Sequence, residues 1–332
     1  MAPSFSGFSR LYHDTIGADV SRISYQQQNF PVQDGELSVH LQLLNDAPRT
    51  LHFLHGNGFA VRSYDALLEG IVGQDNLMLQ DAAGHGLSLA GEQFVGWERS
   101  SERFQALLMQ LRAKHDWSSL IGIGHSFGGC MTLLMNAREA NLFQKNILLD
   151  PALYPPEMIE LLMTLDPEEK RRKSPLVRQT ERRRTHWSSF EEVVDSLRGR
   201  GTFAGWQERC LRDYVQYSTH ENGAGERELN CPPWLEAAVF GSSPLALWSS
   251  LERVVAPTFV LWGTNTLDMF QASYRLAQTL NPNLHFIEVQ GDHCFMMQYP
   301  EETAQLVRAI IDQGMEGVRA LAHSDFIINF DG

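Results

Sequence analysis

One serine in this 332-residue chain stands where nucleophilic catalysis would need it. Ser126 is the centre of Gly124-His125-Ser126-Phe127-Gly128, a Gly-x-Ser-x-Gly pentapeptide between a short apolar run and a helical pattern. A strand–turn–helix of this kind is strained and lifts its serine above the sheet, and flanking glycines avoid backbone collisions. A serine hydroxyl becomes a strong nucleophile when a base takes its proton and an acid orients that base. The pentapeptide therefore predicts a serine nucleophile at position 126.

His293 is the candidate base. It follows an apolar run in a Gly-Asp-His turn near the end of the chain, where the order nucleophile, acid, histidine places a base. Two carboxylates are candidates for the acid: Asp150, directly after the apolar run 146–149, and Asp268, after the run 257–263. Either can accept a hydrogen bond from Nδ1 of His293 and fix its tautomer. We favour Asp150, and Asp268 is the alternative.

Backbone N–H groups at two strand ends could stabilise a negatively charged oxygen in the reaction. The apolar run 49–54 ends in His-Gly-Asn-Gly, and N–H groups beyond a strand end have no partner in the sheet. We expect the oxyanion hole to combine the N–H of Phe127 with that of Asn57. Three residues that flank these loops are expected to line the pocket or to hold its turns: His55, Gly58 and His125.

The elements that would position these groups alternate between strands and helices. Short apolar runs at 76–80, 120–123, 146–149, 257–263 and 284–289 are separated by helical patterns, of which 97–115 is the longest. Such alternation predicts an α/β fold with a parallel sheet covered on both faces. Two partly alternating runs, 21–25 and 35–43, predict an antiparallel hairpin at one edge of that sheet.

The alternation stops between residues 151 and 248, where only helical signals occur. Asp166 followed by Pro167, for example, is a typical helix start. We therefore divide the chain into a core, residues 1–150 and 249–332, and an inserted helical cap, residues 151–248. Apolar side chains of the cap could roof a pocket for an acyl group. The tail 314–332 is apolar at 326–330, but its place in the fold is not predicted.

Together these motifs resemble the α/β-hydrolase family over roughly residues 35–313. The sequence at 55–58 looks like its oxyanion loop, 81–88 (Asp-x-x-Gly-His-Gly-x-Ser) like the turn after its fourth strand, 124–128 like its nucleophile elbow and 291–293 like its terminal histidine turn. The resemblance implies an eight-stranded, mostly parallel sheet with a helical cap after the sixth strand. Thr266 stands where the acid is commonest. The setting of Asp150 is similar to that in lipases of this fold whose acid follows strand six.

The expected activity is that of a serine hydrolase acting on a small-molecule carboxylic ester with a hydrophobic acyl group. Ser126 would be acylated, and water activated by His293 would release the acid, without cofactor or metal. Thioester cleavage and cleavage of a carbon–carbon bond in a diketone use the same groups and are alternatives. A low-turnover ligand-binding or receptor protein of this fold is another. The serine at the elbow disfavours epoxide hydrolases and dehalogenases, which use aspartate.

Composition limits the classes of binding partner and the cellular compartment that can be expected. The net charge of −13 disfavours nonspecific nucleic-acid binding. Eight basic residues between Lys170 and Arg184 are an exception; they predict either a solvated helix face paired with acidic neighbours or a weak contact with an anionic membrane surface. No run of 18 apolar residues predicts a transmembrane helix, and residues 1–8 lack the pattern of a secretory signal. The four scattered cysteines are typical of reduced thiols, so a cytoplasmic location is expected.

Overall fold

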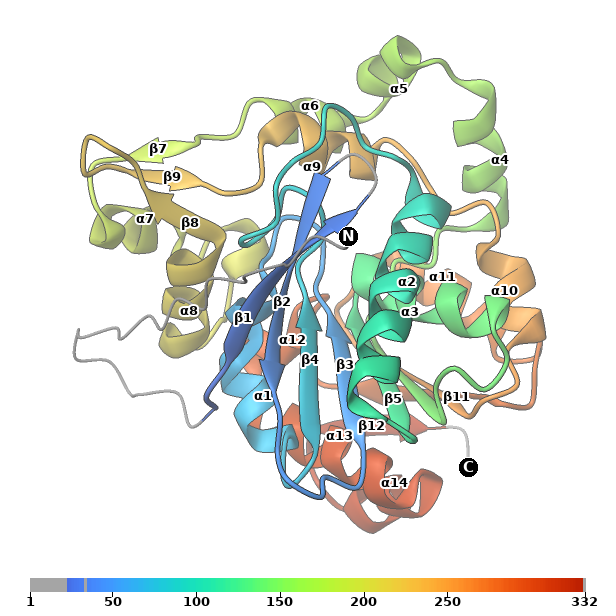
Figure 1. Cartoon of the computed structure of the whole chain (residues 1–332). Helices are drawn as coiled ribbons and strands as arrows, with labels where there is room; N and C mark the ends of the chain where they lie inside the picture. The colour runs from blue at the N-terminus through green and yellow to red at the C-terminus, as the bar shows by residue number, and fades with distance from the viewer. Residues whose placement is uncertain (1–22, 33–34, 331–332) are drawn as a thin grey trace, which may run out of the picture.

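A nine-stranded sheet forms the centre of the computed structural model, which describes residues 23–32 and 35–330 (Figure 1). Its order is β1-β2-β4-β3-β5-β6-β10-β11-β12. The pairs β1/β2, β2/β4 and β11/β12 are antiparallel and the other pairs are parallel. The strands are β1 (Gln26–Val32), β2 (Gly35–Gln42), β3 (Thr50–Leu54), β4 (Asn76–Gln80), β5 (Leu120–His125), β6 (Lys145–Leu149), β10 (Thr258–Gly263), β11 (Leu284–Val289) and β12 (Ile327–Phe330).

Helices cover both faces of this sheet, as the alternating sequence pattern predicts. Neighbouring residues of one strand point to opposite faces, so Ile123 of β5 joins one apolar core and Leu120 the other. On the first face lie η1 (Val61–Tyr64), α1 (Asp65–Ile71), α12 (Phe295–Gln298), α13 (Pro300–Gln313) and α14 (Met315–Leu321). On the second lie α2 (Trp97–His115), α3 (Phe127–Arg138), α10 (Leu247–Arg253) and α11 (Asp268–Ala277).

Both edges of the sheet differ from the sequence prediction. The first hairpin strand is β1 at 26–32 and not 21–25, of which residues 21 and 22 lie outside the described residues. β1 is a half-exposed edge strand with the polar sequence QQQNFPV. Such a sequence gives little of the apolar alternation from which a strand is predicted. At the other edge the unplaced tail supplies β12, which pairs with β11 and makes the described sheet nine-stranded instead of eight-stranded.

The segment 151–248, which we call the insertion, lies between β6 and β10 in the chain. Its helices are α4 (Pro156–Thr164), α5 (Pro167–Lys173), α6 (Pro175–Glu181), α7 (Phe190–Leu197), η2 (Gly201–Phe203), α8 (Glu208–Ser218) and α9 (Pro233–Phe240). Contrary to the prediction of helices alone, it also holds a small sheet of order β7-β9-β8, formed by β7 (His186–Trp187), β8 (Thr219–Glu221) and β9 (Arg227–Leu229). Strands of two or three residues are too short to show a periodicity.

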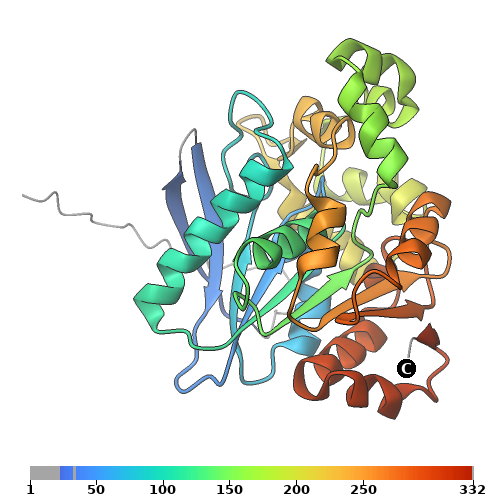
Figure 2. The ribbon, with the colours of Figure 1, turned by 90° about the vertical axis from the view of Figure 1, so that its right-hand side faces the viewer.

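The insertion gathers at one end of the sheet, in green to gold, in both overall views (Figures 1 and 2). Its helices α4 and α5 project farthest from the core. The predicted border between residues 248 and 249 falls inside α10, a helix that packs on α3 of the core.

Asp213 of α8 carries a partly buried acid, with a side chain that is 22% exposed, where the insertion packs against α1. Burial, with a contribution from nearby Asp65, raises the pKa of this carboxyl from 3.8 to about 7, although Arg209 opposes the shift. Among the described residues its Oδ2 makes no hydrogen bond, and the guanidinium of Arg209 lies 3.7 Å away. Between these two pKa values the unfolded chain loses the proton that the folded chain keeps, so this group makes the free energy of unfolding fall as pH rises from about 4 to about 7.

We therefore expect Asp213→Asn, which cannot ionise, to raise Tm at pH 8 and to leave Tm at pH 4 nearly unchanged. Each kcal/mol by which the substitution raises the free energy of unfolding corresponds to an increase in Tm of about 2 to 4 °C in a large domain. Thermal denaturation at both pH values measures the effect, with the exposed Glu252→Gln as control. An unchanged Tm at pH 8 would show that Asp213 is accommodated as a carboxylate without cost.

Candidate active site

The nucleophile elbow is the sharp turn between β5 and α3. Ser126 at its tip has φ +52° and ψ −113°, a conformation that few non-glycine residues adopt. The two glycines are required by close packing: a Cβ on Gly124 would lie 2.3 Å from the carbonyl oxygen of Gly128, and one on Gly128 would lie 2.3 Å from that of Leu54. Further hydrogen bonds fix the turn, such as that from Ser126 N–H to the carbonyl of Leu149 at 3.0 Å.

Ser126, His293 and Asp150 form one chain of hydrogen bonds. Nε2 of His293 lies 3.0 Å from Oγ of Ser126, and its Nδ1 lies 2.8 Å from Oδ1 of Asp150. Asp150 is fully buried, whereas a quarter of the His293 side chain is exposed. With Nδ1–H donating to the carboxylate, Nε2 is left as the acceptor for the serine hydroxyl proton. The arrangement matches that of a nucleophile, a base and an orienting acid.

Asp150 accepts three further hydrogen bonds. Its Oδ2 accepts from the N–H of Gly263 at 2.8 Å, and its Oδ1 accepts from Oγ1 of Thr266 at 2.6 Å and from the hydroxyl of Tyr274 at 3.0 Å. Thr266, which stands at the commonest place for the acid, is thus a donor to the acid on the neighbouring strand. The sequence prediction did not assign this role to Thr266 or Tyr274. For Thr266, the sequence offered one indication of this role, namely a threonine at the place where the acid is commonest.

Asp268 lies apart from this hydrogen-bonded chain. It is exposed and is the first residue of α11, with its carboxylate in the first turn of the helix. An acidic residue there interacts favourably with the helix dipole. No hydrogen bond joins it to His293 in the described part of the chain. Of the two candidate acids, the structure thus brings Asp150 and not Asp268 to the histidine.

Asn57 and Phe127 lie at the ends of adjacent parallel strands, β3 and β5. Within residues 23–32 and 35–330, neither backbone N–H donates a hydrogen bond to the protein. Phe127 is the first residue of α3, so its N–H also lies at the positive end of the helix dipole. Both predicted oxyanion donors are thus without a hydrogen-bond partner in the described part of the chain.

His125 connects the loop after β3 to the histidine turn through its side chain. The hydroxyl of Tyr64 accepts from the N–H of Gly56 at 3.1 Å and donates to Nδ1 of His125 at 2.7 Å. Nε2–H of His125 then donates to the carbonyl of His293 at 3.0 Å. Burial lowers the pKa of His125 well below its ordinary value, and the neighbouring His293 lowers it further, so the ring is neutral. His125 therefore supports the geometry of the site and does not exchange protons.

Tyr64→Phe would interrupt this connection. It leaves the N–H of Gly56 and Nδ1 of His125 without partners in a buried place, at a cost of about 1 to 3 kcal/mol for each unsatisfied group. We expect a lower Tm and a kcat reduced about tenfold, because proximity effects are sensitive to small shifts of the reacting groups. Thermal denaturation and steady-state kinetics measure both. The matched control is Tyr299→Phe, since Tyr299 packs through its ring against Phe326, a contact that phenylalanine keeps. Equal effects of the two variants would contradict the prediction.

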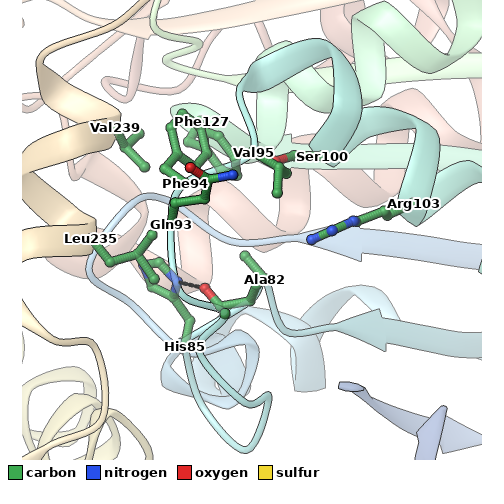
Figure 3. Close-up of a pocket in the computed structure, with 12 residues that line it drawn as sticks. Ala82, His85, Gln93, Phe94, Val95, Ser100, Arg103, Phe127, Leu235 and Val239 are labelled. Atoms are coloured by element: carbon green, nitrogen blue, oxygen red, sulfur yellow. Dashed lines mark hydrogen bonds between the residues drawn. The ribbon is translucent and has the colours of Figure 1, made fainter. Parts of the chain in front are cut away.

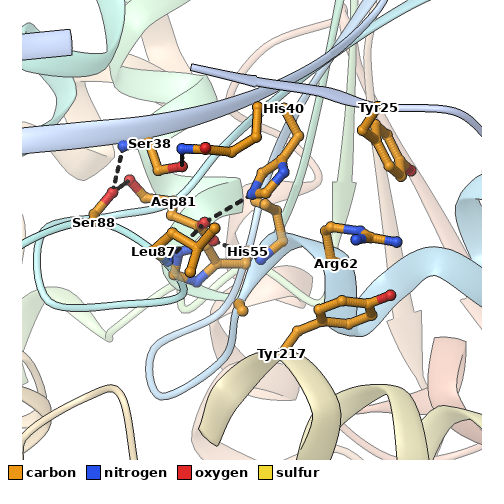
Figure 4. A network of polar contacts seen from close by, with 12 residues as sticks. Tyr25, Ser38, His40, His55, Arg62, Asp81, Leu87, Ser88 and Tyr217 are labelled. Atoms are coloured by element: carbon orange, nitrogen blue, oxygen red, sulfur yellow. Dashed lines mark hydrogen bonds and ion pairs between the residues drawn. The ribbon is translucent and has the colours of Figure 1, made fainter. Parts of the chain in front are cut away.

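The turn after β4 is held by Asp81, which accepts hydrogen bonds from three segments (Figure 4). Its carboxylate accepts from the N–H groups of Val61 and Leu87, and its Oδ2 lies 3.2 Å from Nε2 of His40. Although burial opposes it, the hydrogen bond from His40 lowers the pKa of Asp81. The Asp-x-x-Gly-His-Gly-x-Ser motif is therefore a structural turn, and Ser88 closes it by donating to the carbonyl of Asp81 at 2.8 Å.

His85 and His55 support the oxyanion loop from this turn. Nε2 of His85 accepts from the N–H of Gly58 at 3.0 Å, and burial, with a contribution from His55, lowers the pKa of His85 to about 3. Nδ1–H of His55 donates to the carbonyl of Gly56, and its Nε2 accepts from the N–H of Ala82 at 2.9 Å. Both imidazoles are thus committed to holding loops.

A small cavity lies beside Phe127, between α9 of the insertion and the loop that follows β4 (Figure 3). Its volume is about 20 Å³, which is room for about one water molecule. Leu235 and Val239 of α9 contribute to its mostly apolar lining. The residues expected to line a pocket or to hold its turns, His55, Gly58 and His125, do not line this cavity; their polar groups bond within the loops.

The basic stretch 170–184 forms ion pairs within the chain. Arg171 pairs with Glu181, Arg183 with Glu236 and Arg184 with Glu192, each at 2.6 Å. These contacts agree with a helix face paired to acidic neighbours, and contact with an anionic membrane stays a prediction. Across the described ranges no helix has the length and apolar composition needed to cross a bilayer. The same ranges contain no cluster of three His, Cys, Asp or Glu side chains arranged to hold a metal ion.

Comparison with solved structures places this geometry in a known fold. The chain superposes on E-2-(acetamidomethylene)succinate hydrolase with a TM-score of 0.69 at 18% identity, over 87% of this chain and 100% of that one. It superposes on an esterase from Mycobacterium tuberculosis with a TM-score of 0.62 at 20% identity, over 87% of this chain and 92% of that one. At these identities the likeness shows the fold alone.

Sequence relatives point the same way. The Abhydrolase domain-containing protein AKT2 of Alternaria alternata is 36% identical over 103 residues, which span 31% of this chain and about a third (34%) of that protein's length. Serine hydrolase-like protein 2 of Homo sapiens is 21% identical over 272 residues, 78% of this chain and 85% of that protein. The sequence profile described as "Alpha/beta hydrolase family" matches residues 53–306, more than half of the chain. The chain therefore belongs to the α/β hydrolase family.

Proposed function

We propose that the chain is a serine hydrolase that cleaves carboxylic esters through an acyl-enzyme on Ser126. The observation that carries the proposal is the unbroken hydrogen-bonded chain from Ser126 Oγ through His293 to Asp150, at 3.0 and 2.8 Å. Membership of the α/β hydrolase family supports hydrolase chemistry in general. The serine hydrolase-like protein among its sequence relatives supports the choice of a serine nucleophile.

In the acylation step His293 Nε2 takes the hydroxyl proton of Ser126 while Oγ attacks the ester carbonyl carbon. The carbonyl oxygen becomes negative and accepts hydrogen bonds from the N–H groups of Asn57 and Phe127. The imidazolium is stabilised by Asp150 and then gives its proton to the departing alkoxide as the carbon–oxygen bond breaks. Deacylation repeats these steps with water in place of Ser126, which releases the carboxylic acid and restores the hydroxyl.

The insertion 151–248 serves in this proposal as the cap over the site. The cavity beside Phe127, the residue that follows Ser126, has a volume of about 20 Å³, so side chains or helices of the cap would have to move for it to admit an acyl group. The apolar lining contributed by Leu235 and Val239 favours a hydrophobic acyl group. We propose a small-molecule ester as substrate on these grounds.

A fluorophosphonate probe and a series of p-nitrophenyl esters from acetate to decanoate test the proposal. We expect one covalent label per chain, located at Ser126 by peptide mass spectrometry, and turnover that depends on acyl length. The same acyl groups presented as thioesters, and a panel of β-diketones, distinguish the alternative reactions by relative kcat/KM. An intact chain that takes up no probe and hydrolyses none of the compounds would contradict the proposal and favour a binding role.

A further inference from the structure

The oxyanion loop is held on its outer side by the insertion. Nδ2 of Asn57 donates to the backbone carbonyl of Glu236 on α9 at 3.0 Å. The hydroxyl of Tyr214 on α8 donates to the carbonyl of Gly58 at 3.3 Å. Gly58 has φ +82°, and a Cβ there would lie 2.6 Å from Oε1 of Glu236. Two helices of the insertion thus contact the two residues that follow His55 and Gly56 in the loop.

An ion pair inside the insertion joins these contacts. Nη1 of Arg183 donates to both carboxylate oxygens of Glu236, at 2.8 and 2.6 Å, and its Nη2 donates to the hydroxyl of Tyr214 at 3.4 Å. The Glu236 side chain is 8% exposed and that of Arg183 is 23% exposed. The pair is therefore largely shielded from water. In such a place an ion pair is weakly screened, and its hydrogen bonds fix the geometry of the two side chains.

We propose that Arg183 and Glu236 are positioning residues of the hydrolase: their ion pair sets the position of the Asn57 N–H in the oxyanion hole. The proposal rests on the proposed function. It differs from a role in roofing the pocket, since Arg183 and Glu236 act on the loop backbone and need no contact with substrate. The insertion thereby contributes to the chemical step as well as to binding.

The physical argument concerns where the oxyanion donor stands. Asn57 follows Gly56 and precedes Gly58, and glycine backbone is less restrained than that of other residues. The core holds this loop through His85 and Tyr64, which bind the N–H groups of Gly58 and Gly56. The insertion holds its side chain and the next carbonyl. When an oxyanion donor shifts, the transition state loses more stabilisation than the bound substrate does. The reason is that the negative charge on the oxygen develops only in the transition state.

Glu236→Gln tests the inference with a minimal change of shape. The amide cannot form the charged pair with Arg183, while the backbone carbonyl that binds Asn57 remains. We expect kcat per active site, titrated with the fluorophosphonate probe, to fall about 10- to 100-fold, with KM changed less than about threefold. The affinity of an alkyl trifluoromethyl ketone, whose adduct places an anion in the hole, should fall in parallel with kcat/KM. Arg183→Lys keeps the positive charge but lacks the planar guanidinium. It should therefore retain more of the wild-type kcat than Glu236→Gln does.

Two further variants separate positioning from stability. Arg171→Met breaks an ion pair of the same insertion whose Arg171 side chain is 61% exposed, and should leave kcat unchanged. The double variant Arg183→Met with Glu236→Met removes both buried charges, so it should restore Tm but keep the low kcat. A double variant that regains wild-type kcat, or Glu236→Gln with wild-type kcat and inhibitor affinity, overturns the inference. Failure of the proposed function is distinguishable, because the unmodified protein would then neither label nor turn over.

Discussion

Ser126→Ala is expected to eliminate fluorophosphonate labelling and to lower kcat on p-nitrophenyl esters by about 10⁴- to 10⁶-fold. Oγ is the only atom removed, and it is the atom that lies 3.0 Å from Nε2 of His293. Without it no acyl-enzyme can form, and the remaining rate comes from substrate binding and the oxyanion donors acting on water. KM should change little, because the hydroxyl contributes mainly to the reacting transition state.

The fold should survive this change. Alanine fits the space of the serine side chain, and the hydrogen bonds that hold the elbow come from backbone atoms such as the Ser126 N–H. Circular dichroism and thermal denaturation check that the variant is folded. Ser249→Ala is the control and should keep both label and turnover, because the Ser249 hydroxyl bonds only within its own helix region, to the carbonyl of Ala246 and to Arg253. Turnover or labelling that persists in Ser126→Ala would place the nucleophile elsewhere.

Asp150→Asn is expected to lower kcat by about 10⁴-fold, whereas Asp268→Asn should leave it within about twofold, as for a surface substitution away from the chemistry. The Asp150 carboxylate accepts four hydrogen bonds, including the one from Nδ1 of His293. An amide presents N–H donors to groups that also donate. The imidazole then prefers the tautomer with the proton on Nε2, which cannot accept the proton of Ser126.

Steady-state kinetics of both variants measure this difference, and Tm shows how much of it comes from instability. Thr266→Val removes one donor to the same carboxylate and keeps the acid, so it should reduce kcat much less than Asp150→Asn. Loss of turnover confined to Asp268→Asn would identify Asp268 as the acid and would require the loop before α11 to rearrange during catalysis.

Local patterns predicted much of the fold correctly. The helix expected at 97–115 is α2 (Trp97–His115), and the helix start expected at Asp166 and Pro167 begins α5 (Pro167–Lys173). These elements have clear apolar periodicity or strong start signals, which short windows detect. The errors occurred where packing and not local pattern decides: β1 is polar at an edge, β12 needs β11 as partner, and β7 to β9 are only two or three residues long.

The histidine cluster near the elbow shows the same limit. Twelve histidines in the sequence offered many candidates, and a sequence cannot say which imidazoles are buried with both nitrogens bonded. His55, His85 and His125 prove to be neutral supports of the loops. Their roles follow from hydrogen bonds to backbone atoms of other segments, which leave no periodic signal.

Short stretches of sequence were enough to predict the elbow around Ser126, the order of the four motifs and the alternation that makes a parallel sheet, because each depends on residues close together in the chain. The packed structure was needed to show that Asp150, 143 residues before His293, meets its imidazole, and that Glu236, the ion-pair partner of Arg183, reaches the oxyanion loop. Such contacts depend on how strands and helices pack across the sheet end. That packing follows from the summed burial of the whole core, and no short stretch of sequence records it.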